Sequence, residues 1–144
     1  MIMTNLSIIS RYSRTFFERR LSEYQIGFTE QLILMYLCTC DAVNQETIAR
    51  HFMLDKGSVA KTLYKLEKKN YITRCNNPDN QREKLITISE HGRSILSLMT
   101  EELQQWHNYL FDGLSKDEID QFTATIEKMS RNAVKIIGRS SQVN

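Results

Sequence analysis

The sequence predicts a mainly helical protein with one small β-hairpin, an α+β fold dominated by helices. Only one proline and five glycines interrupt the 144 residues. Long stretches place apolar residues three or four positions apart, the spacing of a helix that buries one face. This spacing breaks once, between residues 71 and 88, where two short runs rich in β-branched residues flank a polar segment. The expected order is four helices, a hairpin and two long helices.

An apolar stripe marks the first predicted helix, and residues that favour helix caps mark the next three. An apolar stripe predicts a first helix that ends near Gly27, and Thr29 can cap a second helix that runs to Cys40. Asn44 can cap a short third helix, and Asp55 can cap a fourth. The apolar positions that predict the buried faces are Leu6, Ile9, Phe16, Phe17, Leu21, Ile48, Ala49, Phe52, Val59, Leu63 and Leu66.

The hairpin is predicted from two short runs, Tyr-Ile-Thr-Arg at 71–74 and Leu-Ile-Thr-Ile at 85–88. Residues 75–84 between them are polar, include Pro78 and are rich in turn-forming residues. We therefore expect a hairpin with an extended tip.

Two long helices are predicted after the hairpin. Ser89 can cap the first, and Ser115 with Glu118 can form a capping box at the start of the second. Apolar residues in both recur at steps of three and four, the spacing of a seam between packed helices. Such a seam fits packing within one chain as well as packing between two copies. Its positions are Leu96, Met99, Leu103, Trp106, Leu110, Ile119, Phe122, Ile126, Met129, Ala133 and Ile136.

Composition is ordinary for a globular protein, and the cysteines are few. No apolar run approaches the ~18 residues that a membrane helix needs, and Met1–Thr4 lacks a signal-peptide pattern. We expect a cytoplasmic protein without a membrane partner. The odd number of cysteines (Cys38, Cys40 and Cys75) suits a reducing compartment. Cys38 and Cys40 fall in an apolar stretch, which predicts that both are buried.

Two short helices joined by a tight turn and followed by a hairpin form a winged helix-turn-helix. In this arrangement the second helix of the pair, here the one that Asp55 caps, enters the major groove of DNA. Net charge is only +2, but residues 53–84 hold eight Lys/Arg against four Asp/Glu. The local excess of positive charge points to double-stranded DNA as a partner.

The predicted fourth helix offers hydrogen-bond donors on the side opposite its buried stripe. Ser58, Lys61, Lys65 and Lys68 step along that side at helical spacing. In the hairpin, Arg82 suits a narrow minor groove because guanidinium is weakly hydrated, whereas Arg74 and Lys84 are expected to contact phosphates. An exposed lysine face that is merely solvated is the alternative reading. The predicted DNA-binding residues are Lys56, Gly57, Ser58, Lys61, Lys65, Arg74, Arg82 and Lys84.

Several stretches, taken together, resemble the MarR (multiple antibiotic resistance regulator) family from about Phe28 to Ala133. They are residues 27–31, 59–72, 74–92 and 113–118. The resemblance implies a DNA-binding lobe at 28–92 and a dimerisation region made of 1–27 and 93–144. It also implies a homodimer on a palindromic operator, acting as a transcriptional repressor that a small aromatic or phenolic ligand releases.

The resemblance leaves the ligand-binding residues unknown. Tyr12, Phe16 and Tyr36 could line a ligand cleft, although core packing is the more common role of such aromatic residues.

Two positions depart from the family pattern. Asn80 stands where an acid usually braces the wing arginine, so the brace on Arg82 is expected to be weaker unless Asp79 substitutes. Asn70 often corresponds to a glycine, and asparagine tolerates the same left-handed conformation.

Other functions fit the sequence less well. It has no Gly-rich phosphate loop, nucleophile elbow or His/carboxylate cluster of recognisable spacing, so we expect no enzyme, catalytic residue or cofactor. His51, His91 and His107 are scattered, which argues against a metal site. Two alternatives remain: a winged-helix module that binds protein, and a redox-responsive regulator that acts through Cys75.

Overall fold

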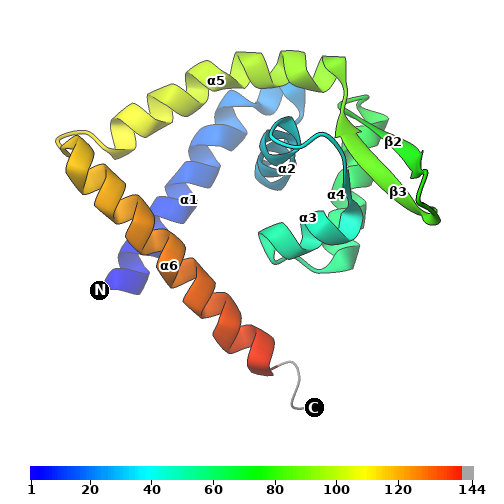
Figure 1. The fold of residues 1–144 in the computed structure, drawn as a ribbon. Helices are drawn as coiled ribbons and strands as arrows, with labels where there is room; N and C mark the ends of the chain where they lie inside the picture. Colours follow the sequence, from blue (N-terminus) through cyan, green and yellow to red (C-terminus); the bar gives the residue numbers. More distant parts are fainter. Residues whose placement is uncertain (141–144) are drawn as a thin grey trace. The chain divides into compact units, whose positions relative to one another are not determined.

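A computed structural model describes residues 1–140 of the chain, with side chains through residue 136. The predicted order of four helices, a hairpin and two long helices is confirmed (Figure 1). The elements are α1 (Ile2–Arg20), the 3-10 helix η1 (Ser22–Tyr24), α2 (Phe28–Cys38), β1 (Val43–Asn44), α3 (Gln45–Phe52), α4 (Lys56–Lys68), β2 (Ile72–Asn77), β3 (Asn80–Ile88), α5 (Glu90–Leu110) and α6 (Lys116–Ser140). The last four residues of the predicted dimerisation region lie outside the described residues.

The chain divides into two compact units, Met1–Trp106 and a second that begins at His107. The second unit contains the end of α5, a turn and α6. Gly113 has a φ of +77° in this turn, a conformation that favours glycine. The aromatic rings of Phe111 and Phe122 lie 6.3 Å apart across the turn. No side chain of α6 is buried through Ile136, the last that the structure describes.

The core of the first unit lies where α2, α3 and α4 meet the three-stranded antiparallel sheet. The sheet order is β1-β3-β2, so β1 adds a third strand to the predicted hairpin. Apolar residues from every element of the unit except η1 and β1 are buried there: Phe17, Leu21, Ile26, Ile33, Leu34, Leu37, Ile48, Ala49, Val59, Leu63, Leu66, Tyr71, Ile72, Ile86, Ile88, Ile95, Leu96 and Met99. The beginning of α1 is not part of this core, since Leu6 and Ile9 are only half-buried.

Four predicted helix caps are present. The Asn44 side chain accepts a hydrogen bond from the Thr47 N–H at 2.8 Å, and Asp55 caps α4 in the same way. The Ser89 hydroxyl accepts from the Gly92 N–H at 2.9 Å, and Ser115 forms the expected capping box with Glu118. These short-range hydrogen bonds explain why local sequence was sufficient to locate the four helix starts.

The boundaries of the first two helices differ from the prediction. Helix α1 ends at Arg20 and is followed by η1, and Gln25 then has a φ of +52°. Gly27, not Thr29, is the cap of α2, because the Glu30 carboxylate accepts from the Gly27 N–H at 3.1 Å.

The prediction that Cys38 and Cys40 are buried was wrong: Cys38 is exposed and Cys40 is half-buried. Helix α2 buries Ile33, Leu34 and Leu37, and Cys38 lies one position beyond this stripe at the helix end. Cys40 comes after the helix, where helical spacing no longer applies.

The strands of the hairpin are longer than expected. Residues 75–77 and 80–84, predicted as part of the loop at the tip, are strand residues, and only Pro78 and Asp79 connect the strands. Cross-strand pairing of residues 75–77 with Asn80, Lys84 and Leu85, and side-chain hydrogen bonds, stabilise this polar tip despite its low β-propensity. Among residues 1–140, no helix is both long and apolar enough to cross a membrane.

Candidate nucleic-acid interface

Helices α3 and α4 are joined by a tight turn in which Met53 has a φ of +51°. Asp55 starts α4: its Oδ1 accepts from the Ser58 N–H at 2.8 Å and its Oδ2 from the Ser58 hydroxyl at 2.5 Å. These hydrogen bonds, first from the side chain and then from the backbone of Ser58, hold the pKa of Asp55 below its usual value. Asp55 therefore stays ionised, and the Ser58 hydroxyl uses its proton within the protein.

Gly57 has a structural role that the sequence did not reveal. A Cβ atom at this position would lie 3.2 Å from Oδ1 of Asp55. The missing side chain therefore leaves room for the cap, in addition to any close approach of the backbone to DNA.

Helix α4 separates an apolar side from a basic side. Val59, Leu63 and Leu66 are fully buried. The opposite side is exposed, and we call it the basic face of α4; it comprises Gly57, Ser58, Lys61, Tyr64, Lys65 and Lys68. The predicted residues of α4 therefore lie together on one accessible surface.

Tyr64 is a residue of the basic face that the sequence reasoning missed. Its side chain is 55% exposed, and the Lys68 ammonium lies 5.0 Å from the ring centre. Hydrogen bonding and charge interaction with Tyr64 raise the pKa of Lys68. Its position three residues after Lys61 and four before Lys68 was the available signal, but the predicted row contained only hydroxyl and lysine donors.

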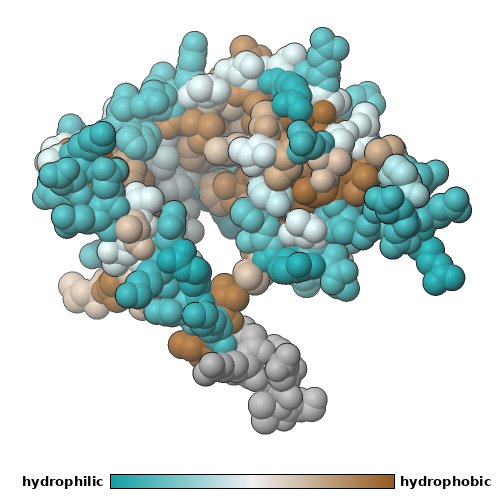
Figure 2. All heavy atoms as spheres, viewed as in Figure 1, coloured by the Kyte–Doolittle hydropathy of each residue, from teal (hydrophilic) through white to brown (hydrophobic). Residues whose placement is uncertain are grey.

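The tip of the hairpin is covered by hydrophilic atoms (Figure 2) and carries Arg82, which is exposed. The predicted contact of Asn80 with Arg82 is made to the backbone of Arg82: Oδ1 of Asn80 accepts a hydrogen bond from the Arg82 N–H at 3.2 Å. Asp79 donates its own N–H to Oδ1 of Asn77 at 3.0 Å. Asn80 therefore contacts the backbone of Arg82.

Arg74 and Lys84 each contact another side chain of this chain. Nε of Arg74 lies 3.0 Å from Oε2 of Glu67, an ion pair without hydrogen-bond alignment, and only 23% of the Arg74 side chain is exposed. Lys84 donates to Oδ1 of Asn76 across the strands. Arg74 is therefore less accessible than the sequence suggested, whereas Lys84 remains exposed.

Lys56 lies with three other predicted residues around one pocket. The pocket measures about 330 Å³ and is lined by Asn44, Gln45, Glu46, Lys56, Arg74, Arg82, Glu83, Lys84 and Ile86. Lys56 is 75% exposed and lies 3.8 Å from Glu46. The predicted residues thus form two adjoining groups, this pocket beside the wing and the basic face of α4.

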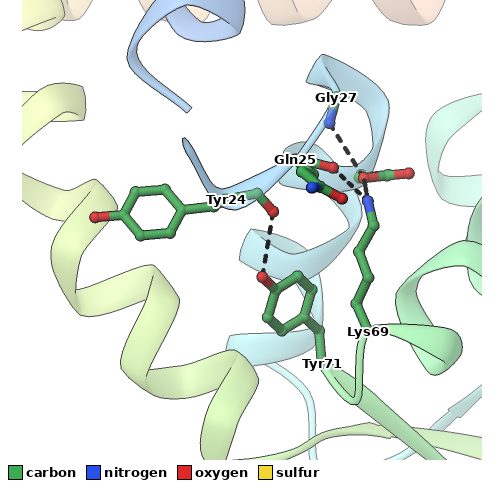
Figure 3. Close-up of polar contacts among 6 residues, drawn as sticks. Tyr24, Gln25, Gly27, Lys69 and Tyr71 are labelled. Atoms are coloured by element: carbon green, nitrogen blue, oxygen red, sulfur yellow. Dashed lines mark hydrogen bonds and ion pairs between the residues drawn. The ribbon is translucent and has the colours of Figure 1, made fainter. Parts of the chain in front are cut away.

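A polar cluster anchors the end of α4 to the chain before α2 (Figure 3). Nζ of Lys69 lies 2.8 Å from Oε2 of the buried Glu30 and also donates to the carbonyl of Gln25. The Tyr71 hydroxyl donates to the carbonyl of Tyr24 at 3.3 Å. Burial, and then the negative charge of Glu30, raise the pKa of Tyr71. These contacts fix α4 to the segment that leads out of α1.

Asn70 ends α4 with a φ of +59°, as its tolerance for the left-handed conformation predicted. The α5 start lies close by. A Cβ at Gly92 would come within 2.2 Å of the Tyr71 carbonyl, so this position requires glycine.

A second pocket lies between α1 and α5. It measures about 340 Å³ and is lined by Tyr12, Thr15, Phe16, Arg19, Arg20 and Trp106. The Phe16 and Trp106 rings are 5.0 Å apart, and the Arg20 guanidinium lies 5.5 Å from the Phe16 ring. Tyr36 does not line it, because its ring stacks on His51 at 4.0 Å. Of the three predicted cleft aromatics, the structure brings Tyr12 and Phe16 together.

Two further predictions concern metal and redox chemistry. Within residues 1–140, no group of three or more His, Cys, Asp or Glu side chains is arranged to hold a metal ion. Cys75 is exposed on β2, with its sulfur 3.9 Å from the carbonyl of Leu85. Among the described residues, no charged side chain forms a hydrogen bond with the Cys75 thiol.

Comparisons with known proteins agree on one group. The model of the MarR family matches residues 29–84. The regulator SarZ of Staphylococcus epidermidis is 30% identical over 118 residues, which cover 75% of this chain and 80% of SarZ.

Two solved structures share the fold over nearly the whole chain. A MarR transcriptional regulator from Methanosarcina mazei is 26% identical, with 94% and 97% of the two chains covered and a TM-score of 0.84. MepR of Staphylococcus aureus, solved as a DNA complex, is 23% identical, with 92% and 98% covered and a TM-score of 0.82.

Proposed function

This chain belongs to the MarR family of DNA-binding transcriptional regulators, and we propose that it is a homodimeric repressor of a palindromic operator. The basic face of α4 carries the proposal. It is the exposed side of a helix whose other side is fully buried, and it follows a capped turn from α3. A helix held in this way can enter a major groove without losing core contacts.

The wing supports a second contact with DNA. Arg82 is exposed at the tip of a hairpin that pairs with β1 and so is tied to the start of α3. An arginine there suits the minor groove beside the major groove that α4 would enter. Lys61, Lys65 and Arg82 are the residues that we propose bind DNA most directly, and Tyr64 is added to them.

The alternative of a protein-binding module predicts an apolar or acidic side on α4. The exposed side instead carries three lysines at positions 61, 65 and 68, which favours a nucleic acid. A DNA-binding regulator works in the compartment that holds its DNA, and a cytoplasmic location is consistent with this.

Dimerisation is supported by apolar side chains that a single chain leaves uncovered. In α6, Phe122 is 42% exposed, and Ile119, Ile126 and Met129 are only half-buried. These residues recur at helical spacing along one side. A second copy of this chain would cover them and supply the twofold symmetry that a palindrome requires.

The pocket between α1 and α5 supports release by a small aromatic ligand. Phe16 and Trp106 offer aromatic surface, and Arg19 and Arg20 offer positive charge for an acidic or phenolic oxygen. A ligand there would favour one arrangement of the chain over another, which is how a binding event weakens DNA affinity. Trp106 is the only tryptophan, so binding of salicylate as a probe would change its emission.

Selection of DNA from a random duplex pool, followed by fluorescence anisotropy over a salt series, tests the function. We expect a palindromic sequence to be enriched and its affinity to fall steeply with salt, because phosphate contacts release counterions. Addition of salicylate at a concentration that changes Trp106 emission should weaken the complex. Enrichment of no sequence, with equal weak binding to all duplexes, would contradict a regulator of this kind.

A further inference from the structure

The tip of the wing contains an irregularity that isolates three residues of β3. Asn76 pairs with Lys84, whereas the next residue, Asn77, pairs with Asn80. Residues 81–83 therefore have no partner in β2. Arg82 is the middle residue of this segment, so backbone pairing does not fix the side chain that is proposed to enter the minor groove.

The Glu83 carboxylate holds this segment on two sides. Its Oε1 accepts from Nδ2 of Asn44 at 2.5 Å, and its Oε2 accepts from Nδ2 of Asn77 at 2.7 Å. All three side chains are half-buried. Hydrogen bonds to an ionised carboxylate are shorter and stronger than those between neutral groups.

Each asparagine also uses its oxygen to shape a different element. Oδ1 of Asn44 caps α3 by accepting from the Thr47 N–H, at 2.8 Å. Oδ1 of Asn77 accepts from the Asp79 N–H in the turn of the wing, at 3.0 Å. Glu83 therefore joins the start of the helix-turn-helix to the turn of the wing, and it does so from the position next to Arg82.

Building on the proposed DNA-binding function, we propose that Glu83 is a positioning residue that sets where Arg82 meets the minor groove. Position 80 is asparagine, and its oxygen holds only the backbone N–H of Arg82. The Glu83 carboxylate, through Asn44 and Asn77, restrains the wing, while the Arg82 side chain stays exposed and available to DNA.

Glu83→Gln separates a positioning role from a purely electrostatic one, because the two predict opposite changes in operator affinity. Removing a negative charge near DNA strengthens binding if only charge matters. Loss of one of the two hydrogen bonds to the carboxylate loosens Arg82 and weakens binding, by about tenfold for a charge-assisted bond. The measurement is the dissociation constant for the selected operator. Unchanged or tighter binding by Glu83→Gln overturns the proposal.

A compensating pair of substitutions provides a rescue. Asn44→Asp keeps the cap of α3, because aspartate caps as well as asparagine, but turns a second carboxylate oxygen towards Glu83. In the double variant Asn44→Asp/Glu83→Gln, the new amide can donate to Asp at 44 and accept from Asn77. Both hydrogen bonds return, the one to position 44 with its donor reversed and the one from Asn77 unchanged, and the net charge equals that of the wild type. We expect each single variant to bind about tenfold more weakly and the double variant to recover most of the affinity. A double variant weaker than both singles overturns the proposal.

The Arg82→Ala background shows whether Glu83 acts through Arg82. If Glu83 acts only through Arg82, Glu83→Gln should change operator affinity by less than about twofold once the guanidinium is gone, because the residue it positions is no longer present. A full tenfold loss in that background means that Glu83 has a purely structural role. Wild-type protein that selects no DNA overturns the proposed function together with this role, whereas a wild type that binds normally and resists Glu83→Gln overturns the positioning role alone.

Discussion

The cationic side chains predicted to bind DNA differ in how far the sequence could predict their surroundings. Lys61 and Lys65 are exposed as helical spacing required, because the opposite side of the helix carries the core residues. Arg74 also reads as a free cation in the sequence, yet it lies beside Glu67. That pairing depends on how β2 lies against α4, which no local pattern encodes.

Lys61→Ala and Arg74→Ala test this difference between an exposed and an engaged cation. Loss of Lys61 should weaken operator binding by about 1–3 kcal/mol and reduce the salt slope by about one unit. Arg74→Ala removes the same formal charge but should weaken binding less, because Glu67 already neutralises it. Anisotropy titrations over a salt series measure both quantities. An Arg74→Ala loss equal to that of Lys61→Ala would contradict the assignment.

Most elements that depend on neighbouring residues were predicted well, whereas the strand pairing of the wing tip, which depends on distant residues, was not. The caps Asn44 and Asp55 act within three residues, so their helices start where the sequence placed them. The start of α2 is an exception, because Gly27 is capped by the nearby Glu30 and the sequence offered Thr29 as the more usual cap. The polar tip of the hairpin, which pairs across two strands, was predicted as loop.

The Glu30–Lys69 pair should contribute measurably to stability. Glu30 is 8% exposed and Lys69 is 25% exposed, so water screens the pair only in part. Removing one partner by Lys69→Met should lower the free energy of unfolding by about 2 kcal/mol, less than for a fully buried pair. Urea denaturation measures the change.

Two variants control for loss of the lysine itself. Glu30→Gln retains an oxygen for the Gly27 N–H and isolates the charge interaction. In the Glu30→Gln background, Lys69→Met should cost much less than in the wild type, because the two residues act as a pair. Equal costs in both backgrounds would mean that Lys69 stabilises α4 independently of Glu30.

At the scale of the whole molecule, the sequence predicted the apolar sides of the two long helices but not which surface covers them. Spacing alone fits packing within a chain or between copies. In the described part of α6 the apolar side chains remain accessible, which favours a second copy. The family relationship, and not the spacing, carries the expectation of a repressor that responds to a ligand.

Phe122→Glu should disrupt a dimer formed through α6. A charge on a surface that another chain covers must be desolvated, so association becomes unfavourable. Sedimentation velocity should show a monomer where the wild type is a dimer, and operator affinity should fall. Gln121→Glu adds the same charge at the neighbouring exposed position and serves as the control. A dimeric Phe122→Glu protein would show that α6 does not form the interface.

The unpaired residues 81–83 also bear on how the wing can vary. The pairs from Ile72 with Ile88 to Asn76 with Lys84 keep one register regardless of what happens beyond them. An insertion or deletion of one residue at position 81 therefore leaves that register intact and alters only the reach of Arg82. Wing length can then change in small steps while the rest of the hairpin keeps its pairing, which makes the point where the wing would meet DNA an adjustable trait.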